Sequence, residues 1–135
     1  MAQIEYDLGA VNAELPKYSL TDEIPVGVWV DGKTIYRKCF HILKSEIAKP
    51  VSGNGTTITN YIINDIDTLV NIYGNMKDSA GTRRPIPFSW TGSNSWMIYA
   101  SISMDNKVKL EYGWLVYYSL TNDGIYIICE YTKTI

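Results

Sequence analysis

The sequence contains few of the side chains from which catalytic and metal sites are usually built. It has one histidine, His41, and two cysteines, Cys39 and Cys129, which belong to no Cys-x-x-Cys pair. A structural zinc ion needs about four nitrogen or sulfur ligands and a catalytic one about three. We therefore expect no metal and no other cofactor. Two buried free thiols are the simpler expectation for the cysteines, and a disulfide stays open if their strands meet.

Long apolar runs, a basic stripe and a signal peptide are also missing. The longest strongly apolar run, Trp114 to Leu120, is too short to span a bilayer. The 12 basic and 14 acidic residues are spread along the chain and leave a net charge of −2, so nucleic acid is not an expected partner. Residues 1 to 9 have neither a basic start nor an apolar core. We expect a chain that is made and kept in a cytoplasm, or leaves it by a route other than secretion, and that has no membrane partner.

Tyrosine and tryptophan, by contrast, are abundant. The chain has 11 Tyr and 4 Trp but only 2 Phe, and 46% of its 135 residues are hydrophobic. Amphipathic aromatic side chains suit half-buried sheet faces and contact surfaces, where one end packs and the other stays hydrated. This length and composition predict one globular domain with an ordinary hydrophobic core.

Short runs of β-branched and aromatic residues, separated by turn residues, predict an all-β protein. Asp31-Gly32 between two such runs, 26–30 and 34–43, predicts a hairpin. Six further strands are expected, at 56–63, 67–73, 96–104, 107–112, 114–120 and 125–133. These runs predict an antiparallel, jelly-roll-like β-sandwich over residues 21–135. One helical turn within residues 62–73 is an alternative.

Apolar alternation predicts the register of two hairpins. Directly opposed residues share a face, so the even-numbered apolar residues of 96–104 must oppose those of 107–112 across an odd loop such as 105–107. In the last hairpin an odd loop at 122–124 sets Tyr117 opposite Cys129. Both faces of that hairpin would be apolar, which predicts cover from a second sheet or from another subunit.

The first 20 residues differ from the rest and predict an extended segment. Single apolar residues alternate with polar ones there, and Pro16 interrupts any continuous element. Four apolar side chains could add a strand to a neighbour or lie in its groove: Ile4, Tyr6, Leu8 and Val11. A loosely ordered terminus is the alternative.

No catalytic arrangement is evident, so we expect a protein that is not an enzyme. His41 lies among apolar strand residues, which favours a packed histidine over a general base. Asp65 and Asp67 could share a strand face, but aspartate at a strand start commonly forms turns. A depolymerase that uses paired carboxylates, Asp65 with Asp67 or Glu111 with Glu130 from neighbouring runs, is the competing possibility.

Two groups of residues are candidates for surface contacts. Arg83 and Arg84 are adjacent in a proline-bearing connection and could clamp an anionic partner or a carboxylate. Trp90 and Tyr99 lie around a polar loop and could stack on sugar rings. Trp96 is also near this loop, but its place in the apolar alternation favours core packing.

The stretch Tyr18-Ser-Leu-Thr-Asp-Glu-Ile-Pro-Val-Gly-Val-Trp-Val-Asp-Gly-Lys-Thr-Ile-Tyr-Arg-Lys38 resembles a module at the C-terminal ends of tailed-bacteriophage fibre proteins. In that module a Tyr-Ser-Thr-Glu-Glu stretch leads into Gly-Thr-Trp-Ile-Asp-Gly-Lys-Pro-Ile-Tyr. Arg84-Pro-Ile-Pro-Phe88 and Glu130-Tyr-Thr-Lys-Thr134 continue the likeness, which covers residues 18–135. Ile4-Glu-Tyr-Asp-Leu-Gly9 is similar to the particle-attachment segment of some of these fibres, although the shaft that separates the two parts there is absent here.

The resemblance implies a virion structural protein, made in the bacterial cytoplasm and carried as a homotrimeric knob on the virion surface. Without a shaft, it implies a short head fibre or capsid decoration protein. Residues 1–20 would dock on a phage capsid protein, and the knob would adhere to host or environmental surfaces. The alternative is a tail fibre, a receptor-binding adhesin that recognises host cell-surface glycan. The resemblance carries over no catalytic residue.

Overall fold

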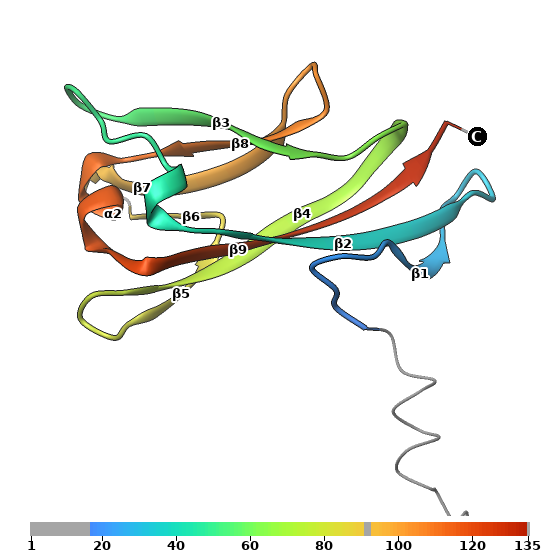
Figure 1. The fold of residues 1–135 in the computed structure, drawn as a ribbon, viewed down its shortest axis with the longest axis horizontal. Coiled ribbons are helices and arrows are strands. Elements are labelled where there is room, and N and C mark those ends of the chain that lie inside the picture. Colours follow the sequence, from blue (N-terminus) through green and yellow to red (C-terminus); the bar gives the residue numbers. More distant parts are fainter. Residues whose placement is uncertain (1–16, 91–92, 135) are drawn as a thin grey trace, which may run out of the picture.

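The structure of the protein, a computed structural model, describes residues 17–90 and 93–134 (Figure 1). The candidate attachment residues Ile4, Tyr6, Leu8 and Val11 lie outside these ranges. In chain order the elements are β1 (Ile24–Val28), β2 (Thr34–Ile42), the 3-10 turn η1 (Lys44–Glu46), β3 (Gly55–Ile62), β4 (Ile66–Asp78), β5 (Arg83–Ile86), β6 (Phe88–Trp90), β7 (Ser93–Ile102), β8 (Lys107–Tyr112), the helix α2 (Trp114–Ser119) and β9 (Leu120–Lys133).

The strands form two antiparallel sheets that stack on one another (Figure 1). One sheet has five strands in the order β1-β2-β9-β4-β5, and the other has four in the order β3-β8-β7-β6. The predicted antiparallel β-sandwich is therefore confirmed. Because β5 and β6 end their respective sheets, both are edge strands.

The core lies between the two sheets and takes alternate side chains from each strand. The larger sheet contributes Phe40, Ile42, Ile125, Ile127 and Tyr131, and the smaller one Ile98, Val108, Leu110 and Tyr112. Polar atoms inside are paired: the Tyr112 hydroxyl donates to the carbonyl of Ala48 (2.5 Å) and shares a hydrogen bond with the Thr57 hydroxyl (2.7 Å). Burial of these apolar side chains is the main driving force of the fold.

Both short-range predictions in the first and middle hairpins are confirmed. β1 pairs with β2 across the turn that holds Asp31-Gly32, and Gly32 has a positive φ of 87°. In the β7–β8 hairpin Ile98 opposes Tyr112 and Ala100 opposes Leu110, so even-numbered residues face one another. The N–H of Ser103 donates to the carbonyl of Lys107 (2.8 Å). This hydrogen bond closes the hairpin and leaves a loop with an odd number of residues, 104–106.

Residues 62–73 form no helical turn. The chain turns at Asp65, which has a positive φ of 62°, and continues as the long strand β4. The carbonyl of Asp65 accepts a hydrogen bond from the N–H of Thr134 (2.9 Å), which ties this turn to the end of β9. An aspartate in a turn is the role expected for Asp65.

The predicted strand at 114–120 is wrong, because residues 114–119 form the helix α2. β8 and β9 belong to different sheets, so the chain must cross the end of the sandwich between them. At Gly113, where this crossing begins, the backbone packs tightly against β7, since a Cβ there would lie 1.9 Å from the carbonyl oxygen of Ser95. The run Trp114 to Leu120 is apolar without alternation, a pattern that fits a short helix as well as a strand.

The last predicted hairpin is therefore wrong as well. Cys129 opposes Lys38 on one side and Ile72 on the other, and the ring of Tyr117 stacks against Tyr112 at 6.2 Å instead. The predicted two-faced hairpin, which required outside cover, does not exist. Ile128, on the outer face of β9, is 7% exposed because residues 18–20 of the same chain lie beside it.

The two cysteines are buried free thiols, as expected. Cys39 opposes Ile128, and Cys129 opposes Lys38, so the two side chains point to opposite faces of the sheet. Burial raises the pKa of the Cys129 thiol to about 12, and the neighbouring Cys39 adds to this shift. Both thiols are therefore protonated at neutral pH.

Two glycines with positive φ allow the backbone fit of the sheet to be tested. Gly124 (φ 76°) lies within β9, where a Cβ would be 2.0 Å from the carbonyl oxygen of Ile42, whereas Gly32 (φ 87°) has nothing within 4 Å. Gly32→Ala should cost about 1–2 kcal/mol of unfolding free energy, from backbone strain alone. Gly124→Ala should cost about 3 kcal/mol or more, because the clash is added. Urea unfolding of both variants measures the difference, and equal losses would contradict this packing.

Candidate functional site

The sandwich opens at one side between the edge strands β5 and β6, and the strongest candidate site lies there. A groove of about 400 Å³ is lined by Arg84, Phe88, Ser89, Trp90 and Trp96. Its volume falls within the usual range for small-ligand sites, roughly 300–1,000 Å³. Arg84 comes from β5 of the larger sheet, and the other four residues come from β6 and β7 of the smaller one.

The guanidinium of Arg84 is held in place on three sides. Its Nε donates to Oδ2 of Asp78 (3.2 Å), and its Cζ lies 5.3 Å from the ring centroids of both Phe88 and Trp96. Stacking on aromatic faces restrains a planar guanidinium and keeps its N–H donors in one plane. Among the side chains that the structure describes, Asp78 is the one hydrogen-bond acceptor of this group, and its contact uses Nε.

Asp78 is the support of the groove. Its Oδ1 accepts from the backbone N–H of Ala80 (3.0 Å) and of Thr82 (2.9 Å), so the carboxylate also closes the β4–β5 turn. Burial of the carboxyl acts to raise its pKa, but the Thr82 N–H, the Arg84 guanidinium and the Ala80 N–H together hold the pKa below its usual value. A charged carboxylate at neutral pH follows, and it orients Arg84.

Trp90 supplies an open aromatic surface at the rim of the groove. It is 62% exposed, at the end of the edge strand β6, where the register with β7 is irregular. Trp96, in contrast, is half-buried and packs against the core while its ring also meets Arg84. Core packing was the interpretation for Trp96, and that part is confirmed.

The other two sequence candidates lie away from the groove. Arg83 precedes Arg84 in β5, so its side chain points to the outer face of the larger sheet, where it opposes Lys77. Tyr99 opposes Glu111 on the outer face of the smaller sheet and is 43% exposed. The sequence pattern thus grouped four residues, of which the fold brings Arg84 and Trp90 together.

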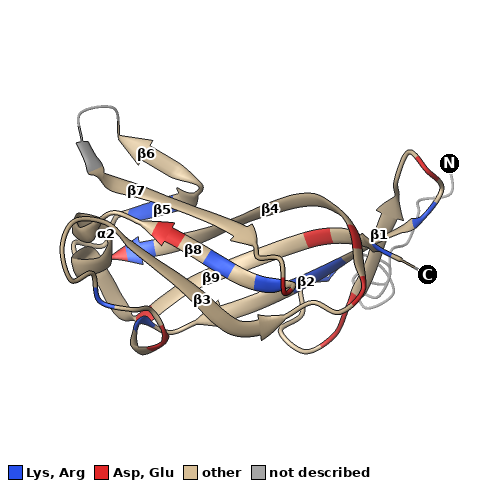
Figure 2. Ribbon diagram, turned by 90° about the horizontal axis from the view of Figure 1, so that it is seen from above, with Lys and Arg blue, Asp and Glu red and all other residues tan. Residues whose placement is uncertain are grey.

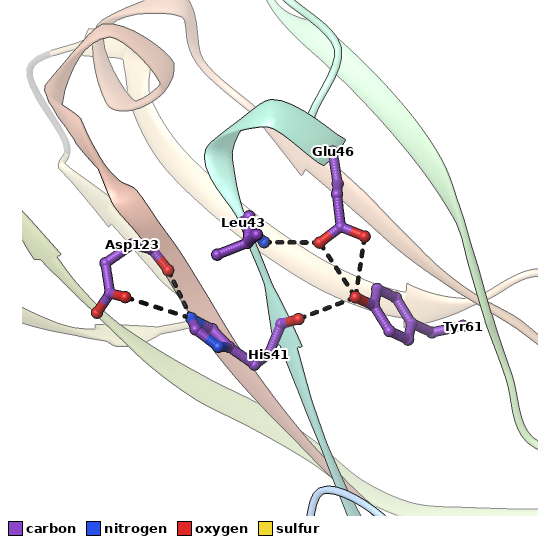
Figure 3. Close-up of polar contacts among 5 residues, drawn as sticks. All are labelled: His41, Leu43, Glu46, Tyr61 and Asp123. Carbon is purple, nitrogen blue, oxygen red and sulfur yellow. Dashed lines mark hydrogen bonds and ion pairs between the residues drawn. The ribbon is translucent and has the colours of Figure 1, made fainter.

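His41 is engaged in contacts that join β2 to β9 (Figure 3). Its Nε2–H donates to the carbonyl of Asp123 (2.6 Å), and its ring stacks on Tyr126 at 4.3 Å and 9°. Beside it, the Tyr61 hydroxyl bonds to the carbonyl of His41 (3.0 Å) and to the Glu46 carboxylate (2.9 Å). These contacts support a packed histidine, because Nε2, the ring nitrogen nearest the Asp123 carboxylate (3.7 Å), already donates to a carbonyl.

Three of the four carboxylates considered for catalysis are paired with basic side chains. Asp67 pairs with Lys33, Glu111 with Lys109 (3.5 Å), and Glu130 with Arg37 (2.9 Å). In the ranges that the structure describes, no group of three or more His, Cys, Asp or Glu side chains gathers in a way that could hold a metal ion. Nor does any described helix have the length and apolar character needed to cross a membrane.

A second groove, of about 410 Å³, lies on the outer face of the larger sheet. It is lined mainly by Tyr18, Leu20, Tyr73, Tyr126 and Ile128. Burial raises the pKa of the Tyr73 hydroxyl, which also donates to Glu130 (3.2 Å). Among the described residues that line this groove none is a lysine or an arginine, so its lining offers fewer charged groups than the groove at Arg84.

Comparison of the chain with protein-family models, with curated proteins and with solved structures found no match in any of the three. The function must therefore be argued from the sequence and from the geometry of the groove.

The sequence pattern did not identify Phe88 as a lining residue of the groove or Asp78 as the partner of Arg84. Asp78 was not singled out, since an aspartate before Ser-Ala-Gly reads as an ordinary turn residue. Strand parity offered one signal: Arg84 and Ile86 alternate with exposed residues, so the Arg84 side chain must point inward at the sandwich mouth. The contact between Arg84 of the larger sheet and Trp96 of the smaller one is not indicated by any local sequence pattern.

The lowered pKa of Asp78 predicts a measurable acid sensitivity. The charged carboxylate stabilises the fold above its unfolded pKa, about 3.9, and this contribution is lost as pH falls through the lower folded value. Asp78→Asn should therefore be less stable than wild type at pH 7, and the gap should narrow below about pH 4. Urea unfolding at pH 7 and at pH 3 measures this, and parallel pH profiles would refute the role of the charge.

Proposed function

We propose that this chain is a structural protein of a bacteriophage virion, a short head fibre or capsid decoration protein. Residues 1–20 attach it to the capsid, and the β-sandwich is displayed on the particle surface as a knob. The resemblance of residues 18–135 to the fibre module supports this proposal, as does the sandwich fold. The protein acts in this role by binding, without catalysis.

The observation that carries the proposal is where the chain enters the sandwich. The carbonyl of Ser19 accepts from the N–H of Cys39 (3.0 Å), and the carboxylate of Glu23 accepts from the Tyr131 hydroxyl and the Lys133 ammonium. These contacts fasten the first described residues to β2 and β9. β1 lies toward one end of the long axis, and β5 and β6 lie toward the other (Figures 1 and 2). A knob tethered in this way leaves its groove free.

A tail fibre that recognises host glycan is the second candidate. The groove at Arg84 and Trp90 favours this reading, because an exposed aromatic ring beside a fixed cation is a feature of ligand-binding surfaces. Both candidates place the protein on the virion surface and differ in the particle component to which residues 1–20 dock.

Deleting residues 1–16 should separate attachment from folding. The deletion removes no residue of the described sandwich, so the truncated knob should unfold at the same urea concentration as the full chain. It should not co-sediment with particles assembled in its presence, whereas the full chain should. Immunogold labelling of those particles would show whether the protein lies on the head or on the tail.

Incorporation of the truncated chain at the level of the full chain would overturn the role of the segment. Absence of the full chain from purified particles would overturn the virion proposal itself. As a matched control, the substitution Tyr99→Ala lies on the outer face of the smaller sheet and should leave incorporation unchanged.

The proposed knob is a homotrimer, as in the fibre module that the sequence resembles. Tyr18 and Leu20 remain 62% and 52% exposed on the outer face of the larger sheet, which leaves apolar surface for neighbours. Sedimentation equilibrium of the full chain should give the mass of three chains of 15.3 kDa, about 46 kDa. A mass of 15.3 kDa at micromolar concentration would contradict the trimer.

A further inference from the structure

We infer that the groove between β5 and β6 binds a carboxylated saccharide, with Arg84 taking the carboxylate and Trp90 the sugar ring. This inference deepens the proposed display function, on which its biological setting rests, by naming the class of ligand. The binding chemistry itself depends only on the groove. It can therefore be tested with the isolated protein.

Arg84 is prepared to bind an acid group. Asp78 and the two rings hold the guanidinium in one orientation, while the Asp78 contact occupies Nε alone. The Nη groups are therefore the donors left for a ligand, within the set of side chains that the structure describes. A planar guanidinium matches a carboxylate through two parallel N–H···O bonds, and preorganisation lowers the entropic cost of forming them.

The local charge also favours an acid. Lys77 and Arg83 oppose each other directly across β4 and β5, and Arg84 follows in the same strand (Figure 2). Asp78 is the one carboxylate in this stretch of two strands and their turn, 77–86. The cations therefore exceed the carboxylates here, although the whole chain carries a net charge of −2. A negative ligand gains from this imbalance, and it gains most at low salt.

Trp90 and Ser89 supply the rest of a sugar site. The C–H face of a pyranose ring is apolar, so it gains by leaving water and packing on the exposed indole of Trp90. Ser89 also lines the groove and adds polar surface for ring hydroxyls. One aromatic surface, one fixed cation and one polar residue together match a ring that carries both hydroxyls and a carboxylate.

Single-stranded nucleic acid is a weaker fit to the same residues. Binding of that kind uses a basic track along the backbone and several aromatic platforms in succession. The groove offers one oriented guanidinium and one open ring, and Lys77 and Arg83 point to the other face of the sheet. A ligand with its charge and its ring in a single unit is therefore favoured over a polymer of phosphates.

Binding to polygalacturonate and to its methyl ester tests the inference. The two polymers share one sugar backbone, and only the acid form presents carboxylates. Isothermal titration at low salt should show that the full-length protein binds the acid form about tenfold more tightly than the ester. Trp90→Ala and Arg84→Lys should each weaken binding to the acid form by about tenfold or more.

Matched variants control for general surface effects. Arg83→Ala removes the adjacent arginine on the opposite face, and Tyr99→Ala removes an exposed aromatic from the outer face of the smaller sheet. Tyr99→Ala should leave the affinity for polygalacturonate within about twofold of wild type, and Arg83→Ala should lower it far less than Arg84→Lys does, because it removes only part of the diffuse local charge. Because Arg84→Lys disturbs the Asp78 contact, the stability of this variant should be measured by urea unfolding alongside its affinity. Trp90 is exposed, so Trp90→Ala should leave the fold intact.

Three outcomes would overturn the inference: equal affinity for the acid and the ester, an equal loss of binding in Tyr99→Ala, or tighter binding of single-stranded DNA than of polygalacturonate. The groove variants should still join particles like wild type. Saccharide binding by a protein that is absent from virions would overturn the virion proposal alone. Incorporation without saccharide binding would overturn this inference alone.

Discussion

Strand β9 is the constraint on which the rest of the structure depends. It pairs with β2 along one side and with β4 along the other, so the five-stranded sheet is continuous only through it. Its inward side chains Ile125, Ile127 and Tyr131 are fully buried against the smaller sheet. A strand in this position must also be covered on its outer face. That cover comes from His41 on Tyr126, from residues 18–20 beside Ile128, and from Arg37 on Glu130.

The same arrangement explains why the candidate groove lies at the edge. A sandwich buries the middle of its sheets, but edge strands such as β5 and β6 leave inward-facing side chains at an open mouth. A cation can remain there if it is paired, and the pairing of Arg84 with the buried Asp78 meets that condition. The contact that makes this edge stable therefore also presents oriented donors to a ligand.

Much of the fold could be predicted because it rests on local patterns. Asp31-Gly32 marks a turn whatever surrounds it, and the alternation in residues 96–112 sets which residues share a face. The prediction failed at residues 114–119, where five apolar residues in succession, 114–118, contain no period that separates a strand from a helix. For the candidate site, residue type pointed to Arg84 and Trp90, but it pointed equally to Tyr99, which the fold places on another surface.

By itself, the sequence determined the strand-rich class, the β1–β2 hairpin, and which residues of β7 and β8 oppose one another. Each follows from interactions between near neighbours or from side-chain chemistry. Only the tertiary structure decided that β9 joins β2 to β4, that α2 carries the chain between sheets, and that Arg84 meets Trp96. These depend on contacts between residues distant in the chain, whose free energies appear only when both sheets are packed and their edges meet.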